Sequence, residues 1–391
     1  MEFLRNSRDL PVSFILISVS MTLLFGIYLP SGVEADETSF SAVVQSCFLS
    51  WVPDGSSSLT PSRIDQLVLD HRVKGDEAAA VAAIHTYFRS HKAVSALSTG
   101  DLLQADIAEE PHQGSDNLPQ ARGFNSQFRK FSQHLKMVPR TIFANDAPRL
   151  EGMHQGPLGD CWVVSSIGAA VHFHPLHLKE MILPQPDGSC TVAFSDGRSV
   201  RVNPLTDTQI ALSSNAGDQG LWLNVLEQAF GQVRKSLVPK VRGMFELDAL
   251  SRGGNARYSI TRLTGHSARK FHIRPIRAKA FPPDLKRRPQ LVAQVRNIIQ
   301  TAVKGKHLIC AGTTTRGKFP PGIGHPHDYA VLAYHTRSDA VTLWNPHGSN
   351  FEPKGPPGLS NGYSMVNGVL RMPVHDFTLI FGAMFFETPG V

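Results

Sequence analysis

A cysteine at the junction of a glycine-rich loop and an apolar helix is the residue best placed to do chemistry in this sequence. Cys161 follows Gln155-Gly156-Pro157-Leu158-Gly159-Asp160 and precedes a run of small and apolar residues. Gly and Pro disfavour a helix, whereas Asp160 is a good N-cap, so the pattern predicts a helix starting at Cys161. The helix dipole and exposed N–H groups should favour the nucleophilic thiolate there. The Gln155 amide could donate to an oxyanion on the attacked carbonyl.

A general base and a group to orient it follow later in the chain. His327 lies in a turn that enters a predicted strand, and Asn345 ends the next predicted strand at an Asn-Pro turn. Residues 335–340 between them are typical of a hairpin connection, so the two side chains should lie at matching ends of neighbouring strands. The sequence therefore predicts a Cys-His-Asn triad made of Cys161, His327 and Asn345.

In these residues and in the motifs around them, the chain resembles the calpain family of papain-fold cysteine proteases. Papain-type enzymes share a Gln six residues before a Cys-Trp pair, and Leu158-Gly159-Asp160-Cys161-Trp162 is the calpain form of that motif. Further segments resemble the family in the same order, at 221–230, 263–266, 304–312, 374–377 and 385–388. The resemblance covers roughly residues 140–388.

The resemblance implies a papain-like, two-lobed α+β fold. The first lobe would be mainly helical around Cys161, the second an antiparallel β half-barrel or sandwich, and the active site the cleft between them. It also implies endopeptidase activity, in which Cys161 attacks a peptide carbonyl, Gln155 helps to hold the oxyanion, His327 acts as base and acid, and Asn345 orients the imidazole. Protein or peptide substrates are the expected partners.

His325 competes with His327 for the role of base. In calpains a His, one residue and an aromatic residue open the strand, and His327-Asp328-Tyr329 fits that frame, whereas His325 is two residues early. His327 is therefore the predicted base. The family also follows its triad Asn with Pro-Trp-Gly, but His347 stands in place of the Trp, so the His–Asn hydrogen bond is expected to be wetter here.

The carboxylates that bind calcium in the family match poorly. Gly152 stands where an Asp is expected, Asn367-Gly368-Val369 replaces an acidic pair, and Glu352 is shifted by one residue. Calcium needs hard oxygen ligands, so calcium control is not carried over, and neither a cofactor nor a metal is predicted.

The N-terminus predicts export. Arg5 and Arg8 precede an apolar run over 12–29, and Ala35 offers a cleavage site, so residues 1–35 are interpreted as a signal peptide of a secreted or periplasmic protein. An uncleaved membrane anchor over 12–29 is the alternative.

The remaining chain divides into four expected parts. Residues 36–97 form a helical module with predicted helices over 59–68 and 75–88, which resembles a degenerate EF-hand whose loop keeps one acid and has Arg63 near the place of the bidentate Glu. Residues 98–139 are the expected linker and lead-in, 140–250 the first protease lobe and 251–391 the second.

Charge and cysteine content narrow the function classes. The net charge is +7, with basic residues over 269–279 and 286–288, which we interpret as a solvated strand face or an acidic-substrate rim and not as a nucleic-acid site. Four cysteines do not make a disulfide scaffold, although a Cys47–Cys190 bridge stays open. Two other functions also stay open: a weakened protease scaffold acting as a secreted binding protein, and an acyl transferase or amidase using the same triad.

Overall fold

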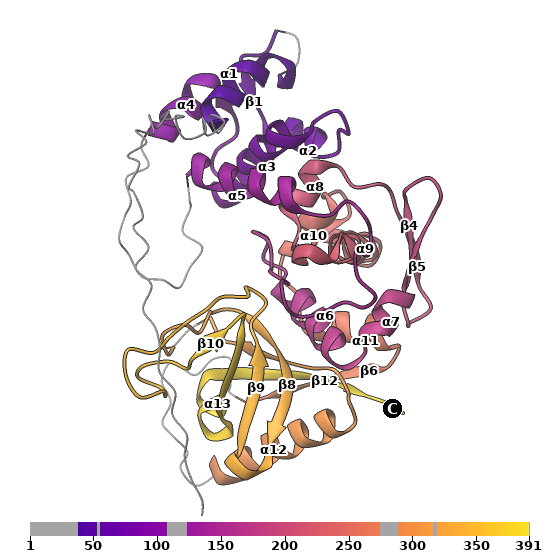
Figure 1. Cartoon of the computed structure of the whole chain (residues 1–391), viewed down its shortest axis with the longest axis vertical. Coiled ribbons are helices and arrows are strands. Elements are labelled where there is room, and N and C mark those ends of the chain that lie inside the picture. The colour runs from indigo at the N-terminus through magenta and orange to yellow at the C-terminus, as the bar shows by residue number, and fades with distance from the viewer. Residues whose placement is uncertain (1–37, 53–54, 108–122, 274–287, 316–318, 391) are drawn as a thin grey trace, which may run out of the picture. The chain divides into compact units, whose positions relative to one another are not determined.

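The computed structural model describes residues 38–52, 55–107, 123–273, 288–315 and 319–390 (Figure 1). The predicted signal peptide and the alternative anchor lie outside these residues, as does most of the basic segment after residue 273. None of the described helices is both long and apolar enough to cross a membrane. Residues 38–391 form one compact unit of helices and antiparallel strands, which agrees with the predicted α+β class.

The N-terminal part consists of two helix–strand–helix units. The first contains α1 (Phe40–Trp51), β1 (Ser58–Leu59) and α2 (Pro61–Val68), and the second contains α3 (Gly75–Ser90), β2 (Leu97–Ser98) and α4 (Thr99–Ile107). The two strands pair antiparallel, with Leu59 opposite Leu97. Thr60 starts α2 by accepting a hydrogen bond from the Arg63 N–H at 3.3 Å. α2 and α3 lie where the sequence predicts helices.

Helices also occupy much of the segment that was expected to be a linker and lead-in. α4 covers 99–107, and α5 (Phe124–Met137) packs against α3. The apolar residues of α5 recur at helical spacing and are buried, namely Phe124, Phe128, Phe131 and Leu135. The linker expectation rested on the Gly, Pro and polar content of 98–122 and is wrong for α4, while 108–122 lie outside the described residues.

One hydrophobic core joins the N-terminal helices to the segment that carries Cys161. It contains Trp51, Ile64 and Phe128 from the helices above, with Leu158 from the loop before Cys161 and Leu212 from α8 (Asp207–Leu212). Burial of this apolar surface on both sides stabilises the contact between the two parts. The N-terminal helices therefore share their core with the segment expected as the first protease lobe.

Residues 161–264 form a helical layer with a small sheet. The helices are α6 (Cys161–Phe173), α7 (Pro175–Glu180), α9 (Trp222–Leu237), α10 (Glu246–Ser251) and α11 (Ala256–Thr264), with 3-10 turns η1 (Gly217–Gln219) and η2 (Pro239–Val241). The sheet has the order β3 (Ile182–Pro184), β4 (Cys190–Ala193), β5 (Ser199–Val202). α11 packs on α6 through Ala256, Ile260 and Leu263, so this helix belongs to the α6 core although it was assigned to the second lobe.

The C-terminal part is a single seven-stranded sheet with all neighbouring strands antiparallel. Its strands are, in order across the sheet, β10 (Met365–Val366), β11 (Val369–Pro373), β9 (Ala340–Trp344), β8 (Asp328–His335), β7 (Ile309–Thr313), β12 (Phe381–Thr388) and β6 (Ser267–His272). The turn η3 (Thr336–Ser338) joins β8 to β9, with His335 opposite Ala340, which confirms the predicted hairpin. α12 (Arg288–Lys304) and α13 (Val374–Ile380) pack against this sheet (Figure 1).

Both faces of the central strands of this sheet are buried, each in a different core. In β7, Cys310 joins the core of α6, while Ile309 and Ala311 join the core that contains α12 and α13. In β9, Trp344 joins the first core and Leu343 the second. Alternate residues of a strand point to opposite faces, so the sheet lies between α6 on one side and α12 with α13 on the other.

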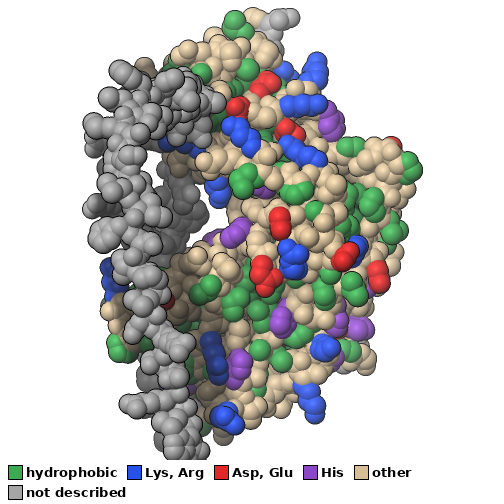
Figure 2. Space-filling view, in the orientation of Figure 1, with side chains coloured by type: hydrophobic (Ala, Val, Ile, Leu, Met, Phe, Trp, Pro, Cys, Tyr) green, Lys and Arg blue, Asp and Glu red, His purple; other side chains and the backbone are tan. Residues whose placement is uncertain are grey.

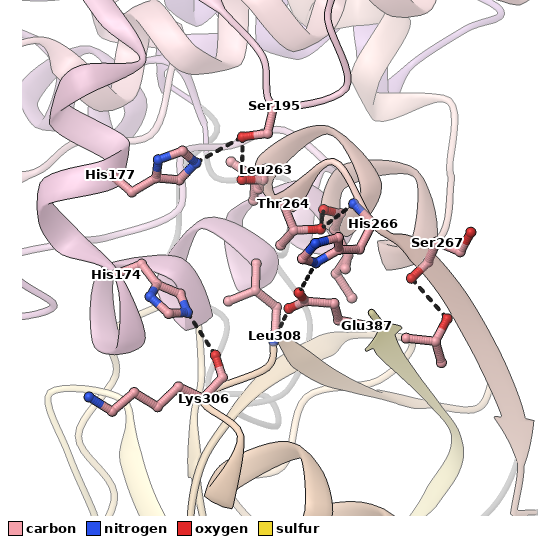
Figure 3. Close-up of polar contacts among 12 residues, drawn as sticks. His174, His177, Ser195, Leu263, Thr264, His266, Ser267, Lys306, Leu308 and Glu387 are labelled. Atoms are coloured by element: carbon pink, nitrogen blue, oxygen red, sulfur yellow. Dashed lines mark hydrogen bonds and ion pairs between the residues drawn. The ribbon is translucent and has the colours of Figure 1, made fainter. Parts of the chain in front are cut away.

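A row of polar contacts near the start of α7 and the end of α11 ties the helical layer to the sheet (Figure 3). His174 Nε2 lies 2.7 Å from the Lys306 carbonyl oxygen, and the Ser195 hydroxyl donates to the Leu263 carbonyl at 2.9 Å. His266 Nδ1 lies 2.5 Å from a Glu387 carboxylate oxygen, and the other carboxylate oxygen accepts from the Leu308 N–H at 2.8 Å. These contacts connect five places in the chain, at 174, 195, 263–266, 306–308 and 387.

All four cysteines are free thiols. Cys190 is buried in β4, whereas Cys47 lies on α1 beside the N-terminal core. The bridge between Cys47 and Cys190 that the sequence left open does not form, because the two residues belong to different cores.

Figure 2 shows how charged side chains are distributed on one face of the molecule. Lys and Arg side chains on that face are dispersed among acidic, histidine and apolar ones. β6, the described part of the basic run, alternates exposed with partly buried positions over 267–270, as the expected strand with one solvated side requires.

Candidate active site

Cys161 is the first residue of α6, as the loop-to-helix pattern predicts, and it is partly buried. Asp160 occupies the N-cap position, but its side chain makes no capping hydrogen bond. α6 packs against β8, so the thiol comes near the start of that strand, where the backbone N–H of Asp328 interacts with it. The structure thus brings Cys161 to the strand that directly follows His327.

Two glycines allow the backbone segments around Cys161 to approach one another closely. A Cβ at Gly168 would lie 2.4 Å from the Trp344 ring, so α6 can rest on β9 only without a side chain at that position. A Cβ at Gly156 would lie 2.6 Å from the Ser213 carbonyl oxygen. Trp344 therefore faces α6, away from the side chain of Asn345, as expected for neighbouring residues at the end of a strand.

His327 and Asn345 meet at matching ends of β8 and β9. His327 immediately precedes β8 and Asn345 immediately follows β9, in an antiparallel register with Ala330 opposite Trp344. The His327 Nε2 atom lies 2.8 Å from Asn345 Oδ1. Both side chains are buried, with exposed fractions of 6% and 3%.

The contacts of Asn345 fix the protonation of the His327 ring. Asn345 Oδ1 also accepts from the His347 backbone N–H at 3.0 Å, so this atom is the amide oxygen and not the nitrogen. His327 Nε2 must then be the donor in the 2.8 Å contact. In the neutral imidazole the lone pair consequently lies on Nδ1, which is left to take a proton.

The two neighbouring histidines have different surroundings. The His347 ring stacks on the His327 ring with centroids 4.2 Å apart, in the position after Asn345-Pro346 where the family has a Trp. Because this ring covers one face of His327, the hydrogen bond to Asn345 is buried, and the expectation of a wetter contact is wrong. His325 instead stacks on Phe319, with centroids 4.2 Å apart.

Burial keeps both the thiol and the imidazole neutral in this arrangement. Burial raises the pKa of the Cys161 thiol well above its usual range, and the Asp328 carboxyl group raises it further. Burial lowers the pKa of His327 to about 3, and repulsion from His347 adds to this shift. The expected thiolate is therefore not the favoured form, because desolvation outweighs the helix dipole.

Gln155 lies beside Cys161 but its amide is engaged. Its Nε2 atom donates to the Leu158 carbonyl at 2.6 Å and to Asp160 Oδ1 at 3.1 Å. An amide nitrogen has two hydrogens, so both are used. The backbone N–H of Gln155 donates to the Pro346 carbonyl at 2.7 Å and ties this loop to the turn after Asn345. The predicted oxyanion donor would have to release one acceptor before it could bind an oxyanion.

A buried carboxyl pair underlies this loop. Burial raises the pKa of Asp160 and of Glu227, and the Asp160 charge raises the pKa of Glu227 further. Glu227 accepts from the Ser214 N–H at 2.8 Å and its hydroxyl at 2.6 Å, and that hydroxyl accepts from the Gly156 N–H at 3.2 Å. Two adjacent buried carboxyl groups favour a shared proton, so Glu227 is held as the acid and Asp160 as the acceptor for Gln155.

Sequence reasoning missed two acidic residues of the site. Asp328 follows the predicted base directly, and burial raises the pKa of its carboxyl group to about 7 although Lys270 lowers it. Glu227 was noticed only as part of a helix motif. The sequence does place the Asp328 carboxyl group directly after the candidate general base, which could have drawn attention to it. Only the fold shows that Asp328 faces Cys161.

The family model described as calpain family cysteine protease matches residues 125–361, which include all but the first residue of α5, together with Cys161, His327 and Asn345. No curated protein matches the chain.

Proposed function

This chain belongs to the calpain family of cysteine proteases, and we propose that it is an endopeptidase that uses Cys161, His327 and Asn345 without calcium control. The observation that carries the proposal is the buried hydrogen bond of 2.8 Å between His327 Nε2 and Asn345 Oδ1. It leaves the Nδ1 lone pair of a neutral base free, at the end of the sheet to which α6 brings the thiol. We also propose the papain-like two-lobed arrangement, in which these groups line the cleft.

The reaction is an acyl transfer through the sulfur. His327 Nδ1 takes the proton of the Cys161 thiol as the sulfur bonds to the peptide carbonyl carbon, and the carbonyl oxygen becomes an oxyanion. The Cys161 backbone N–H and one N–H of Gln155 hold that oxyanion. His327 then gives its proton to the leaving amine, and a thioester remains. Water, deprotonated by His327, attacks the thioester, and the acid product and the thiol are released.

The resting geometry explains how this reaction would be restrained before substrate binds. The thiol and the imidazole are both neutral, and Gln155 donates to Leu158 and Asp160. Substrate must therefore provide an oxyanion that competes with the Leu158 carbonyl for the Gln155 amide. An active enzyme needs this change of hydrogen-bond partner at Gln155 when substrate binds, whereas a decayed protease scaffold does not.

Peptide hydrolysis by purified mature protein tests the proposal. We expect Cys161→Ala to lose at least about 1,000-fold in kcat/KM, since the residues of a triad act as a unit. Cys47→Ser is the matched control, because this free thiol lies on α1, and its activity should stay within twofold. His325→Ala should cost less than tenfold and His327→Ala far more.

Three outcomes would contradict the proposal. Activity that survives in Cys161→Ala would exclude the sulfur as nucleophile, and a greater loss in His325→Ala would move the base. Rapid alkylation of Cys161 with no cleavage of casein, together with turnover of small amides, would favour the amidase or acyl-transferase alternative. Export to the periplasm or medium is a further proposal, which detection of the mature chain outside the cytoplasm would test.

A further inference from the structure

A buried histidine at the contact between the N-terminal helices and α10 has unused ring nitrogens. His85 lies on α3 and is 2% exposed. Within the described part of the chain, neither its Nδ1 nor its Nε2 atom has a hydrogen-bond partner. A buried imidazole without partners is unfavourable, so the site must offset this cost in another way.

Two carboxylates from different helices face the His85 ring. Asp65 Oδ1 on α2 and Asp248 Oδ1 on α10 each lie 3.6 Å from His85 Nε2. That separation is too long for a hydrogen bond. All three atoms lie within 4.8 Å of one another. The ring nitrogen and the two oxygens therefore converge on one point without bonding to each other.

The spacing and the donor types match one class of ligand. Zinc binds His nitrogen and carboxylate oxygen at about 2.0–2.2 Å, so two donors at the corners of a tetrahedron lie about 3.3–3.6 Å apart. The two nitrogen–oxygen separations of 3.6 Å agree with this geometry. An imidazole donor favours zinc and similar transition metals over magnesium and calcium, which take oxygen ligands. We propose that Asp65, His85 and Asp248 bind a zinc-like divalent cation.

The electrostatic surroundings bear on this site in two ways. A metal binds the neutral form of an imidazole, through the lone pair of one ring nitrogen. Arg89 forms an ion pair with Asp248 and also donates to Ser251. Arg89 pairs with Oδ1, the same Asp248 oxygen that faces His85, so it holds this carboxylate in place and also competes with a cation for that atom. Arg89 also offers an alternative explanation for the two carboxylates, since its positive charge alone could balance them without a metal ion.

A cavity provides access to the three donors. It has a volume of about 520 Å³ and is lined by Asp65, His85 and Asp248, together with Leu158 from the loop before Cys161. The Asp65 side chain is 48% exposed, so a cation can enter from its side, and water can supply a fourth ligand. A bound ion would join α2 and α3 to α10. The cation would thus fasten the N-terminal helices to the protease segment, a role separate from peptide hydrolysis.

Zinc binding by the full mature chain tests the proposal, with Cys161→Ala as the parent so that the active-site thiol cannot take the metal. Asp65→Asn removes one half-exposed ligand and leaves the Arg89–Asp248 pair in place, and His85→Gln removes the nitrogen donor. Asp70→Asn and His71→Gln are matched controls just after α2, outside the three donors. Circular dichroism confirms that each variant is folded.

Calorimetry should show one tight zinc ion per parent chain, weakened at least about tenfold in Asp65→Asn and in His85→Gln and unchanged in both controls. Cobalt should give the intense visible absorption of tetrahedral coordination in the parent only. Zinc should also raise the melting temperature of the parent and not of Asp65→Asn. Equal affinity in the parent and in Asp65→Asn, or no zinc bound, would overturn the proposal and leave Arg89 as the resident counter-charge. Activity plays no part in these measurements, so they stand apart from the test of the triad.

Discussion

At the scale of single residues, the proposed site combines a well-oriented candidate base with a candidate nucleophile whose ionisation is suppressed. Asn345 fixes the His327 ring with its Nδ1 lone pair free, whereas burial keeps the Cys161 thiol protonated. The Asp328 carboxyl group adds to this suppression, since its negative charge opposes a nearby thiolate. Asp328 is thus a candidate to control the ionisation of the Cys161 thiol.

Asp328→Asn should make Cys161 more reactive. The pKa of Asp328 is about 7, so at pH 8 its carboxyl group is charged and disfavours the thiolate. Removing the charge should lower the thiol pKa by up to about one unit, and the rate of alkylation by iodoacetamide at pH 8 should rise about threefold to tenfold. Asp218→Asn, at a side chain that is 76% exposed, is the control and should not change the rate. Equal rates in all three proteins would show that burial alone suppresses the thiol.

At the scale of elements, the contact of α6 with β8 and β9 positions the three groups. α6 carries Cys161, and the two strands hold His327 and Asn345 at their adjacent ends. The contact depends on Gly168, which faces Trp344 one residue before Asn345. A shift of this helix by a fraction of an ångström would therefore move the thiol relative to its base.

Gly168→Ala should destabilise the protein and reduce its activity. The added methyl group would lie 2.4 Å from the Trp344 ring. Overpacking costs about 1–3 kcal/mol and outweighs the gain of about 1 kcal/mol in helix propensity. We expect a lower urea midpoint and a lower kcat, because Trp344 precedes Asn345.

Gly100→Ala is the matched control in α4, where the nearest atom to an added Cβ is Ser98 Oγ at 3.7 Å. It should be neutral or slightly stabilising. If the two alanine variants unfold at the same urea concentration, close packing of α6 on β9 does not limit the stability of the protein.

At the scale of the whole molecule, two buried neutral histidines make stability depend on pH. His85 lies at the contact with α10, and His327 lies beside Asn345. Burial lowers their pKa values to about 4 and about 3, below the unfolded value of about 6.5. On acidification the unfolded chain binds these protons first. The stability is therefore fully present above about pH 6.5 and is lost as the pH falls towards 4 and 3.

The contribution of these two histidines to the free energy of unfolding should accordingly fall between pH 6.5 and pH 4, whereas that of Asp328, whose pKa is raised to about 7, increases as the pH falls. Urea titration of the wild type beside a histidine variant isolates the histidine contribution. His327→Gln should make this fall less steep, because the variant has no imidazole to protonate in the unfolded state. His71→Gln, at an exposed position, should keep the wild-type slope. An unchanged slope in His327→Gln would mean that His327 is not held neutral in the folded chain.

Calcium should leave the stability of the whole chain unchanged. Gly152 has φ +81° and no carboxylate, Val369 lies where an acid was expected, and the Arg63 side chain donates to the Trp51 carbonyl at 2.6 Å. A ligand stabilises a protein only if the native state has a site for it, so millimolar calcium should shift Tm by less than about 1 °C. A shift of several degrees in differential scanning calorimetry would reveal a calcium site built from other residues.

The sequence by itself determined the local features. Gly, Pro and Asp before a small apolar run place Cys161 at the start of α6, because these preferences act within a few residues. Two apolar runs joined by a short connection predict the β8–β9 hairpin. The hairpin in turn places His327 next to Asn345. The order of such motifs was enough to indicate the family.

Only the tertiary structure decided which groups are charged and which parts share a core. The thiol is neutral because desolvation and Asp328 act on it through space, which no local pattern records. α5 is a helix, within the segment expected as the lead-in to the protease, because its aromatic face is buried against α3. Asp65, His85 and Asp248 are separated by up to 183 positions in the chain, and they converge because three helices pack together. Burial and long-range charge depend on the whole fold, so they could not be predicted from neighbouring residues.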